Sequence, residues 1–300
     1  MNGYDLHTHT CYSFDCDASL DAYVAAVTAS GLTGVAVTDH DTIEGALRLR
    51  DRNPPFDVIV GCEITLASGA HIIGLFLEQP IQGGWLADTA AAIRAQGGLV
   101  LLPHPYRRET GALAETCPSD DISALMVNVD LIEVFNAKSP PAENKRAAAL
   151  AKTWKRRGAA GSDAHGTASL GQGRIRLSGL QRQLSAHRLL REPVRVVGID
   201  QSLPEVERTH RRREGVRRLA LRFRKQVPET VWRWGKRRWD RMCDQQAGAH
   251  RWPFREYARF TTRISADADD EVVAASPAES VGGGEKHDRL AAGRGTHGNR

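Results

Sequence analysis

The sequence predicts an α/β fold in which strands and helices alternate through residues 1–200. Short apolar runs such as Gly34–Thr38 and Leu99–Leu102 are separated by segments of helical periodicity such as Leu20–Gly31. This alternation favours a parallel sheet with helical crossovers, either open or closed as a barrel. Histidines and carboxylates follow several of the apolar runs, and in a barrel the chemistry collects at the carboxyl ends of the strands. We therefore expect one α/β domain with a polar site at those ends.

The expected elements are bounded by residues that favour helix ends and turns. Ser19 is a good N-cap for the first helix, Gly31 suits its end, and Ser68-Gly69 favours a hairpin turn. The expected strands are Gly3–Leu6, Gly34–Thr38, Asp57–Thr65, His71–Leu77, Leu99–Leu102, Asp130–Phe135, Gly158–Ser162, Gln172–Leu177 and Val194–Val197. The expected helices are Leu20–Gly31, Ile43–Asp51, Trp85–Gln96, Pro141–Arg157 and Leu180–Leu190. No Gly-x-Gly-x-x-Gly or Walker loop follows any of the strands, which argues against dinucleotide or P-loop nucleotide binding.

The cysteines and the apolar runs indicate a reducing compartment. The five cysteines are an odd number without a CxxC pair, which argues against a disulfide framework and against a cysteine-based zinc finger. The first apolar strand begins almost at Met1, which leaves no room for a signal peptide, and no apolar run approaches the ~20 residues of a membrane span. We expect a cytoplasmic protein, with a peripheral membrane position as the alternative.

Basic residues concentrate in one segment near the C-terminus. Arg208–Arg241 holds 14 of the 41 Lys and Arg but 3 of the 36 Asp and Glu, so the rest of the chain is acidic. We predict a barrel over residues 1–200, a basic helical extension rich in Trp and Arg over 205–262, and a disordered tail over 266–300. The extension suits a nucleic acid or an anionic membrane, or packing of its apolar face on the barrel or a second subunit with its arginines solvated. The sequence does not predict an oligomeric state.

Histidines and carboxylates at the expected strand ends form a candidate metal site. His7 and His9 stand at i and i+2 on an extended segment, so both imidazoles point to one side and can reach one ion. Imidazole and carboxylate ligands without thiolate suit Zn, Mn or Fe, and several carboxylates allow a bridged cluster. The candidate ligands are His7, His9, Asp15, His40, Glu63, His104, Glu133, Asp163 and His165. Asp17 is an alternative to Asp15, because one loop offers both carboxylates.

The motifs that carry these residues resemble those of the PHP (polymerase and histidinol phosphatase) superfamily. In chain order the motifs are His7-Thr8-His9, Thr38-Asp39-His40-Asp41, Gly61-Cys62-Glu63, Pro103-His104-Pro105 and Gly161-Ser162-Asp163-Ala164-His165. The resemblance covers residues 3–198 and implies a distorted seven-stranded β/α barrel, two or three divalent ions and hydrolysis of phosphate esters. The first two motifs, with Ile72-Ile73-Gly74-Leu75, are most similar to the branch that includes nucleoside bisphosphate phosphatases and 5′-to-3′ RNA exonucleases.

The resemblance also implies how the ligands divide among the ions. The implied sets are His7, His9, Glu63 and Asp163 for a first ion, Glu63 and His104 for a second, and Asp15, His40 and His165 for a third. Glu63 would bridge the first two ions. The family has a further ligand after the sixth strand, for which Glu133 or Asn136 would have to serve here.

Three residues are predicted to take part in catalysis directly. Ions placed together lower the pKa of a bridging water, so we expect a metal-bridged hydroxide to attack the phosphorus atom. Asp163 and His165 are expected at this reacting centre. Arg107, rather than its neighbour Arg108, is expected to meet phosphate oxygens through its forked donors.

Other polar residues near these motifs are predicted to have structural roles. Asp39 and Asp41 are expected to orient histidines rather than to bind metal. His71 opens an apolar strand and is interpreted as a packed or hydrogen-bonded core histidine. Lys138 and Lys145 are expected on a solvated loop and a solvated helix face.

The function predicted from these residues is metal-dependent hydrolysis of the phosphate ester of a small metabolite or nucleotide, with two or three Mn, Zn or Fe ions. A second hypothesis with the same chemistry is a 5′-to-3′ exonuclease on RNA or DNA ends, for which the basic extension would be the substrate track. A third hypothesis is a non-catalytic anchoring or interaction module. The third hypothesis is disfavoured by the metal motifs, because a domain that had lost its catalytic activity should have lost more of them.

Overall fold

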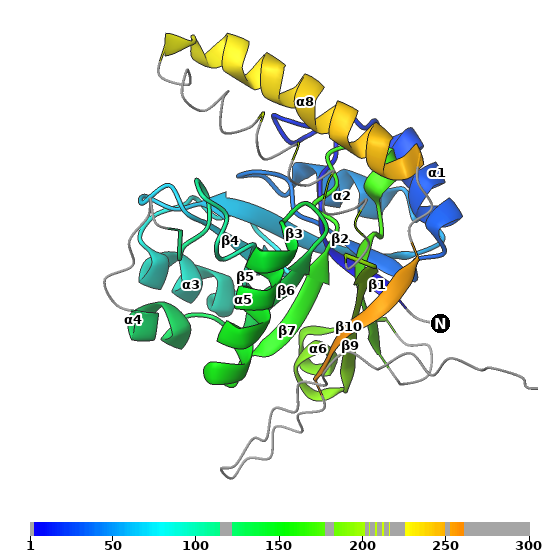
Figure 1. Ribbon diagram of the computed structural model, residues 1–300. Helices are drawn as coiled ribbons and strands as arrows, with labels where there is room; N and C mark the ends of the chain where they lie inside the picture. The colour runs from blue at the N-terminus through cyan, green and yellow to red at the C-terminus, as the bar shows by residue number, and fades with distance from the viewer. Residues whose placement is uncertain are drawn as a thin grey trace, which may run out of the picture.

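The computed structural model describes residues 3–114, 122–177, 183–201, 226–249 and 253–260, and residues 204, 208, 212 and 216 singly. At its centre is a ten-stranded sheet in the order β10-β9-β8-β1-β2-β3-β4-β5-β6-β7 (Figure 1). The strands are β1 (Gly3–Thr8), β2 (Gly34–Val37), β3 (Asp57–Thr65), β4 (His71–Leu75), β5 (Leu99–Leu102), β6 (Leu131–Asn136), β7 (Arg157–Gly161), β8 (Gly173–Leu177), β9 (Val194–Ile199) and β10 (Phe254–Phe260). Most of their residues are buried, because helices cover the outer face and side chains fill the inside.

Strands β1 to β7 form a nearly closed barrel. β1, β2 and β3 are parallel, β4 is antiparallel to both β3 and β5, and β5, β6 and β7 are parallel again. The barrel is brought close to closure where the end of β7, the last strand of the sheet, approaches the end of β1. There Asp163 N donates to His7 O at 2.8 Å and His9 N donates to Ala164 O at 3.0 Å. The predicted seven-stranded α/β barrel is confirmed. The sheet is not wholly parallel, because the predicted Ser68-Gly69 turn folds β4 back along β3 with Gly69 at φ 83°.

Helices α1 to α5 connect the barrel strands on its outer side (Figure 1). The helices of this part of the chain are α1 (Leu20–Ser30), α2 (Glu44–Asp51), α3 (Leu86–Ala95), α4 (Ile122–Val127), α5 (Pro141–Thr153) and α6 (Ala186–Arg191). α1 begins and ends as predicted, with Ser19 Oγ accepting from Ala22 N at 3.3 Å and Gly31 at φ 65°. α4 was not predicted. α6 is shorter than the helix predicted over 180–190: residues 183–185 are not helical, and Ser185 caps the helix by accepting from Arg188 N, while residues 178–182 lie outside the described residues.

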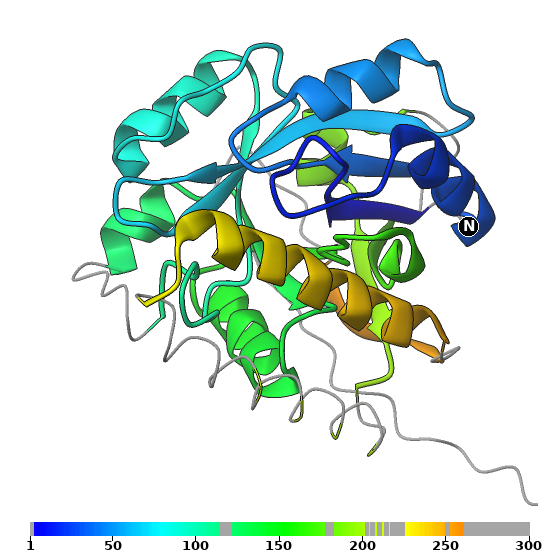
Figure 2. The ribbon, with the colours of Figure 1, turned by 90° about the horizontal axis from the view of Figure 1, so that it is seen from above.

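The C-terminal extension adds a helix and a strand to the barrel. α8 (Glu229–Ala249) lies across the end of the barrel where the parallel strands finish, above it in Figure 1 and in front of it in Figure 2. β10 pairs antiparallel with β9, whereas the extension was predicted to be helical throughout. The strand forms because Phe260 is buried against Gly158, where a Cβ atom would come within 2.1 Å of the ring. Most of residues 202–225 and the tail predicted over 266–300 lie outside the described residues.

Membrane spanning is not supported by any described helix. Among the residues described, none of the helices has both the length and the apolar character that a crossing requires.

Candidate metal centre

The carboxyl ends of the barrel strands bring the predicted ligands together. β1 leads into His7 and His9, and backbone bridges join Thr8 to Ala164 and His40 to Glu63. His104 and Asp163, which follow β5 and β7, have positive φ values of 25° and 53°. Such backbone conformations are costly for residues other than glycine and persist where the surrounding structure fixes them, as at functional sites.

The first ligand set surrounds one oxygen of Glu63. His7 Nε2 lies 3.1 Å and His9 Nε2 3.3 Å from Glu63 Oε2. The same nitrogens lie 3.6 Å and 3.4 Å from Asp163 Oδ1. All four side chains are buried, so these four residues, predicted from sequence as one set, do converge.

The second set lies at the other oxygen of Glu63. His104 Nε2 is 2.9 Å and His71 Nδ1 is 2.8 Å from Glu63 Oε1. His71 is hydrogen-bonded, as its interpretation allowed, but its partner is Glu63 at the centre, which was not expected from the sequence. The hairpin register explains that position, because Thr65 pairs with His71 and Glu63 with Ile73, so Glu63 and His71 are diagonal neighbours on one face.

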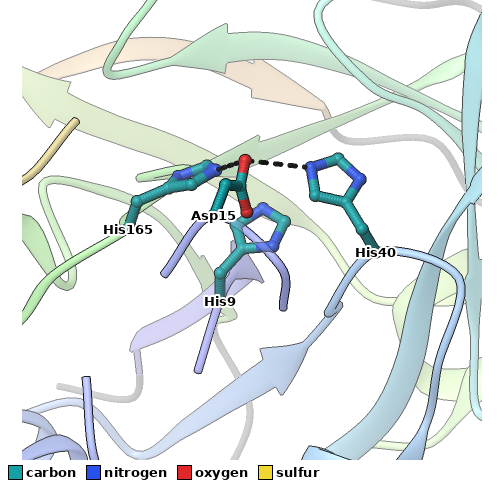
Figure 3. Close-up of side chains that lie close together, drawn as sticks. All are labelled: His9, Asp15, His40 and His165. Atoms are coloured by element: carbon teal, nitrogen blue, oxygen red, sulfur yellow. Dashed lines mark hydrogen bonds and ion pairs between the residues drawn. The ribbon is translucent and has the colours of Figure 1, made fainter. Parts of the chain in front are cut away.

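The third set gathers around Asp15, as Figure 3 shows. Asp15 Oδ2 lies 2.9 Å from His165 Nε2 and 3.5 Å from His40 Nε2, and His9 completes the group. Asp15 is buried, whereas Asp17 is exposed and lies outside this group. The preference for Asp15 over Asp17 therefore agrees with the geometry.

Glu133 and Asn136, the two candidates for the ligand after the sixth strand, both have other contacts. Glu133 Oε1 lies 3.1 Å from His7 Nδ1, and Glu133 Oε2 accepts from His104 N at 2.8 Å. A carboxylate on Nδ1 fixes the ring so that the Nε2 lone pair faces the centre, the usual arrangement around a ligating histidine. Asn136 Oδ1 accepts from Arg107 Nη2 at 3.1 Å. These contacts favour a positioning role for Glu133, and the prediction that it binds metal directly stays a prediction.

Three cationic side chains border the ligands. Arg107 Nη1 lies 2.6 Å from Asp163 Oδ2, Lys138 Nζ lies 2.7 Å from His165 Nδ1, and Lys236 Nζ of α8 lies 2.5 Å from Asp15 Oδ2. Arg107 lies beside the ligands, and its predicted contact with phosphate oxygens stays a prediction. Lys138 was expected on a solvated loop, and that expectation is wrong; Lys145 is exposed as expected. Nothing in the sequence indicated Lys236.

Asp39 and Asp41 hold backbone segments instead of the histidines that they were expected to orient. Asp39 accepts from Thr10 N at 2.6 Å and from Thr10 Oγ1 at 2.7 Å. Asp41, at φ 55°, accepts from Thr65 N at 2.7 Å. Both carboxylates therefore fix the chain beside a ligand, and their hydrogen bonds do not show the predicted orientation of histidines.

The crowding of charge shifts the pKa values of the ligands in opposite directions. Burial lowers the pKa of His9, but Asp163 and Glu63 outweigh it and raise that pKa to about 9. Burial raises the pKa of Glu63, but the histidines around it outweigh that effect and hold the pKa well below its usual range. Burial and the nearby Arg107 lower the pKa of His104 to about 3, so this imidazole is neutral. Ionised carboxylates and a neutral imidazole are the forms that bind metal.

The residues of the centre fit divalent ions. Each of the four overlapping groups of His, Asp and Glu has its ligand atoms within 4.8 Å of one another. Both ring nitrogens of His9, Nδ1 of His40 and Oδ1 of Asp163 are buried without a hydrogen-bond partner. A buried polar atom left in that state costs about 1–3 kcal/mol, which coordination to an ion would remove.

Comparisons with known proteins agree with this description of an α/β barrel that carries a candidate metal centre. The family model described as "PHP domain" matches residues 5–126, and the model described as "PHP-associated" matches residues 141–185. The uncharacterised protein MJ1587 of Methanocaldococcus jannaschii is 35% identical over 146 residues, which cover 44% of this chain and 81% of that protein. The chain belongs to the PHP family.

Two further matches are more distant. An error-prone DNA polymerase of Symbiobacterium thermophilum is 33% identical over 75 residues, which are 24% of this chain and 7% of the polymerase. The crystal structure of PsfC from Pseudomonas syringae matches with a TM-score of 0.52 at 21% identity, covering 74% of this chain and 100% of PsfC. The match to PsfC supports the fold.

Proposed function

We propose that the protein is a metal-dependent phosphoesterase that hydrolyses the phosphate ester of a small metabolite or nucleotide. The observation that carries this proposal is the sharing of Glu63 between two sets of buried ligands, with the third set joined to them through His9. Phosphate ester hydrolysis is extremely slow without a catalyst, and a cluster of ions is a common means to accelerate it. Membership of the PHP family supports the same reaction class.

We divide the proposed ligands by the carboxylate that they lie beside; the compact groups overlap more widely, with His104 beside His7 and Asp163, and His71 beside His40 and Glu63. The sets are His7, His9, Glu63 and Asp163; Glu63, His71 and His104; and Asp15, His40 and His165 with His9 beside them. Bound at these residues, Mn, Zn or Fe ions would supply an activated water and neutralise charge on the phosphoryl oxygens.

The protein's own residues orient and bind the phosphate. Asp163 Oδ1 and His165 Nδ1, 3.4 Å apart, join the first and third ligand sets, so we assign both residues to the reacting centre. Arg107 is largely buried, and its guanidinium plane is fixed by Asp163 and Asn136. An arginine held in this way can donate hydrogen bonds to phosphate oxygens with little loss of side-chain entropy.

Hydrolysis of a generic aryl phosphate and of its diester, with Mn²⁺ supplied, tests the proposal. We expect turnover by the wild type and its loss in His9→Ala, because His9 contacts two of the three ligand sets. His187→Ala is the matched control, because His187 is exposed on α6, away from the centre. Absence of turnover in the metal-loaded wild type with both esters would refute a phosphoesterase.

A nuclease on RNA or DNA ends is the second candidate. It is favoured by exposed arginines of the basic extension such as Arg233, whose guanidinium lies 5.0 Å from the ring centroid of Phe14 in the loop that carries Asp15. Binding through such residues would release counterions, so the affinity for an oligonucleotide would fall steeply as salt rises. A weak salt dependence together with turnover of aryl phosphate would favour the small-molecule enzyme.

A further inference from the structure

One face of α8 is turned toward the metal centre. Trp232, Lys236 and Trp239 are half-buried at spacings of four and three residues, the spacing of one helix face. Trp234 and Arg238 are exposed on the other side. The helix therefore packs on the barrel with a lysine at the centre of its buried face.

α8 contacts two of the loops that contribute to the third ligand set. On one side, the guanidinium of Arg233 lies 5.0 Å from the ring centroid of Phe14, and Arg237 Nη1 lies 3.8 Å from Asp17 Oδ1. On the other side, α8 packs on the short 3₁₀ helix η1 (Thr167–Ser169). Asp15 lies within the first loop, and His165 precedes η1 by two residues. The docked helix thus covers the place where Asp15 and His165 meet.

Lys236 brings a third cation to this place from a distant part of the sequence. Its ammonium reaches Asp15 across 221 positions of the chain, while Arg107 and Lys138 come from the loops after β5 and β6. The three cations contact Asp163, His165 and Asp15, which all belong to the same cluster. Positive groups that surround one small region are suited to an anion with several charged oxygens.

We infer that Lys236 is a substrate-binding residue, and that α8 completes a site for the terminal phosphate group of a small phosphomonoester. This inference rests on the proposed function and names its substrate class. A monoester phosphate carries about two negative charges near neutral pH, whereas a diester within a nucleic acid strand carries one per phosphate. Three cations around one phosphate therefore match a monoester better.

The ion pair between Lys236 and Asp15 can also be interpreted as inhibitory. Lys236 pairs with a carboxylate that belongs to the third ligand set, so an ammonium there could compete with an ion and block the site. The two interpretations predict opposite effects of removing the charge. Loss of a phosphate-binding cation weakens phosphate binding, whereas loss of a blocking cation raises metal content and turnover.

The test compares Lys236→Gln, Lys236→Arg and the control Arg238→Gln with the wild type in the full-length, Mn²⁺-loaded protein. Calorimetric titration with inorganic phosphate gives the affinity directly, elemental analysis gives the metal content, and kinetics on the aryl phosphate give KM and kcat. Arg238 is exposed and lies over the ring of Trp234, so its replacement removes a positive charge from α8 without touching the centre.

We expect Lys236→Gln to bind phosphate about tenfold more weakly and to raise KM by about tenfold with little change in kcat, because one charge-assisted hydrogen bond from a partly exposed lysine is lost. Lys236→Arg should retain most of the phosphate affinity, and Arg238→Gln should match the wild type. Phosphate affinity unchanged in Lys236→Gln, or a gain in metal content or kcat, would overturn the inference. If phosphate binding depends on Lys236 but no ester is hydrolysed by the wild type, the proposed function fails while the phosphate site stands.

Discussion

The metal centre has an inner part and an outer part that are built differently. The inner part, around Glu63, is supplied by the barrel strands and their immediate ends, and its side chains are buried except for the partly exposed His71. The outer part, around Asp15, depends on a loop and on α8, and its Lys236 is 37% exposed. Buried groups held by strand ends are fixed by the fold itself, whereas groups on loops vary without loss of the fold. On the proposed function, the inner part carries two of the ligand sets, whereas the outer part adds the third set and the cation Lys236, which we infer to bind the substrate.

The largest expected effect comes from the inner part. Glu63→Gln keeps the shape of the side chain but removes the charge shared by two ligand sets, so kcat/KM should fall on the order of 1000-fold and metal should be lost. Glu44→Gln is the control, since Glu44 forms an exposed pair with Arg48 on α2 and should have almost no effect. Retention of full metal content by Glu63→Gln would contradict the bridging role.

The attachment of the extension to the barrel gives the next largest effect. Phe260→Ala removes a buried ring from β10 and should lower the free energy of unfolding by about 3–5 kcal/mol, as truncation of a core aromatic does. Phe254→Ala, at the exposed end of the same strand, should cost under about 1 kcal/mol. Denaturant unfolding measures both, and equal effects would show that β10 is not part of the core.

The outer part of the centre is tested by two aspartates in one loop. Asp15→Asn should lose about one equivalent of metal and lower kcat/KM by roughly 10–100-fold, because Asp15 contacts His40 and His165. Asp17→Asn should keep the metal, since Asp17 contacts Arg237 on α8 instead. Elemental analysis of the two variants side by side gives the answer, and a reversed result would assign the third ligand set to Asp17.

A smaller change is expected with pH in the metal-free protein. Folding raises the pKa of His9 to about 9 from an unfolded value near 6.5, so the protonated form is favoured in the folded state. Its contribution to stability is therefore complete below pH ~6.5 and is lost as the pH rises through about 9. In thermal unfolding, the melting temperature of the metal-free protein should fall as the pH rises over this range. Metal affinity should rise over the same range, because ions and protons compete for the same nitrogen.

The candidate ligands of both parts were named from the sequence, apart from His71, whereas two of the three cations beside them were not. The ligands at strand ends could be predicted because parallel strands bring their carboxyl ends to one side of a barrel. His71 was predictable in principle from the hairpin turn, because the register that pairs Thr65 with His71 also places it beside Glu63. The positions of Lys138 and Lys236 could not be predicted, because they depend on how a loop and a distant helix pack.

The C-terminal extension shows the same limit of prediction from local sequence, because its contacts also depend on tertiary packing. Its helical spacing and basic charge predicted α8, but they did not indicate which surface the helix contacts. β10 was missed because its residues give no sign of their partner, which is the edge strand β9. Pairing between distant segments is decided by the whole fold, so local pattern alone could not supply it.

The most direct test of the central claim is the metal content of the wild-type protein and Glu63→Gln, purified without chelators and then supplied with Mn²⁺. Elemental analysis should find two or three equivalents of Mn, Zn or Fe in the wild type and a clear loss in the variant, because Glu63 contacts ligands of both inner sets. A wild-type protein that holds no metal after Mn²⁺ is supplied would contradict the account, since the buried histidines and carboxylates would then have to be explained without ions.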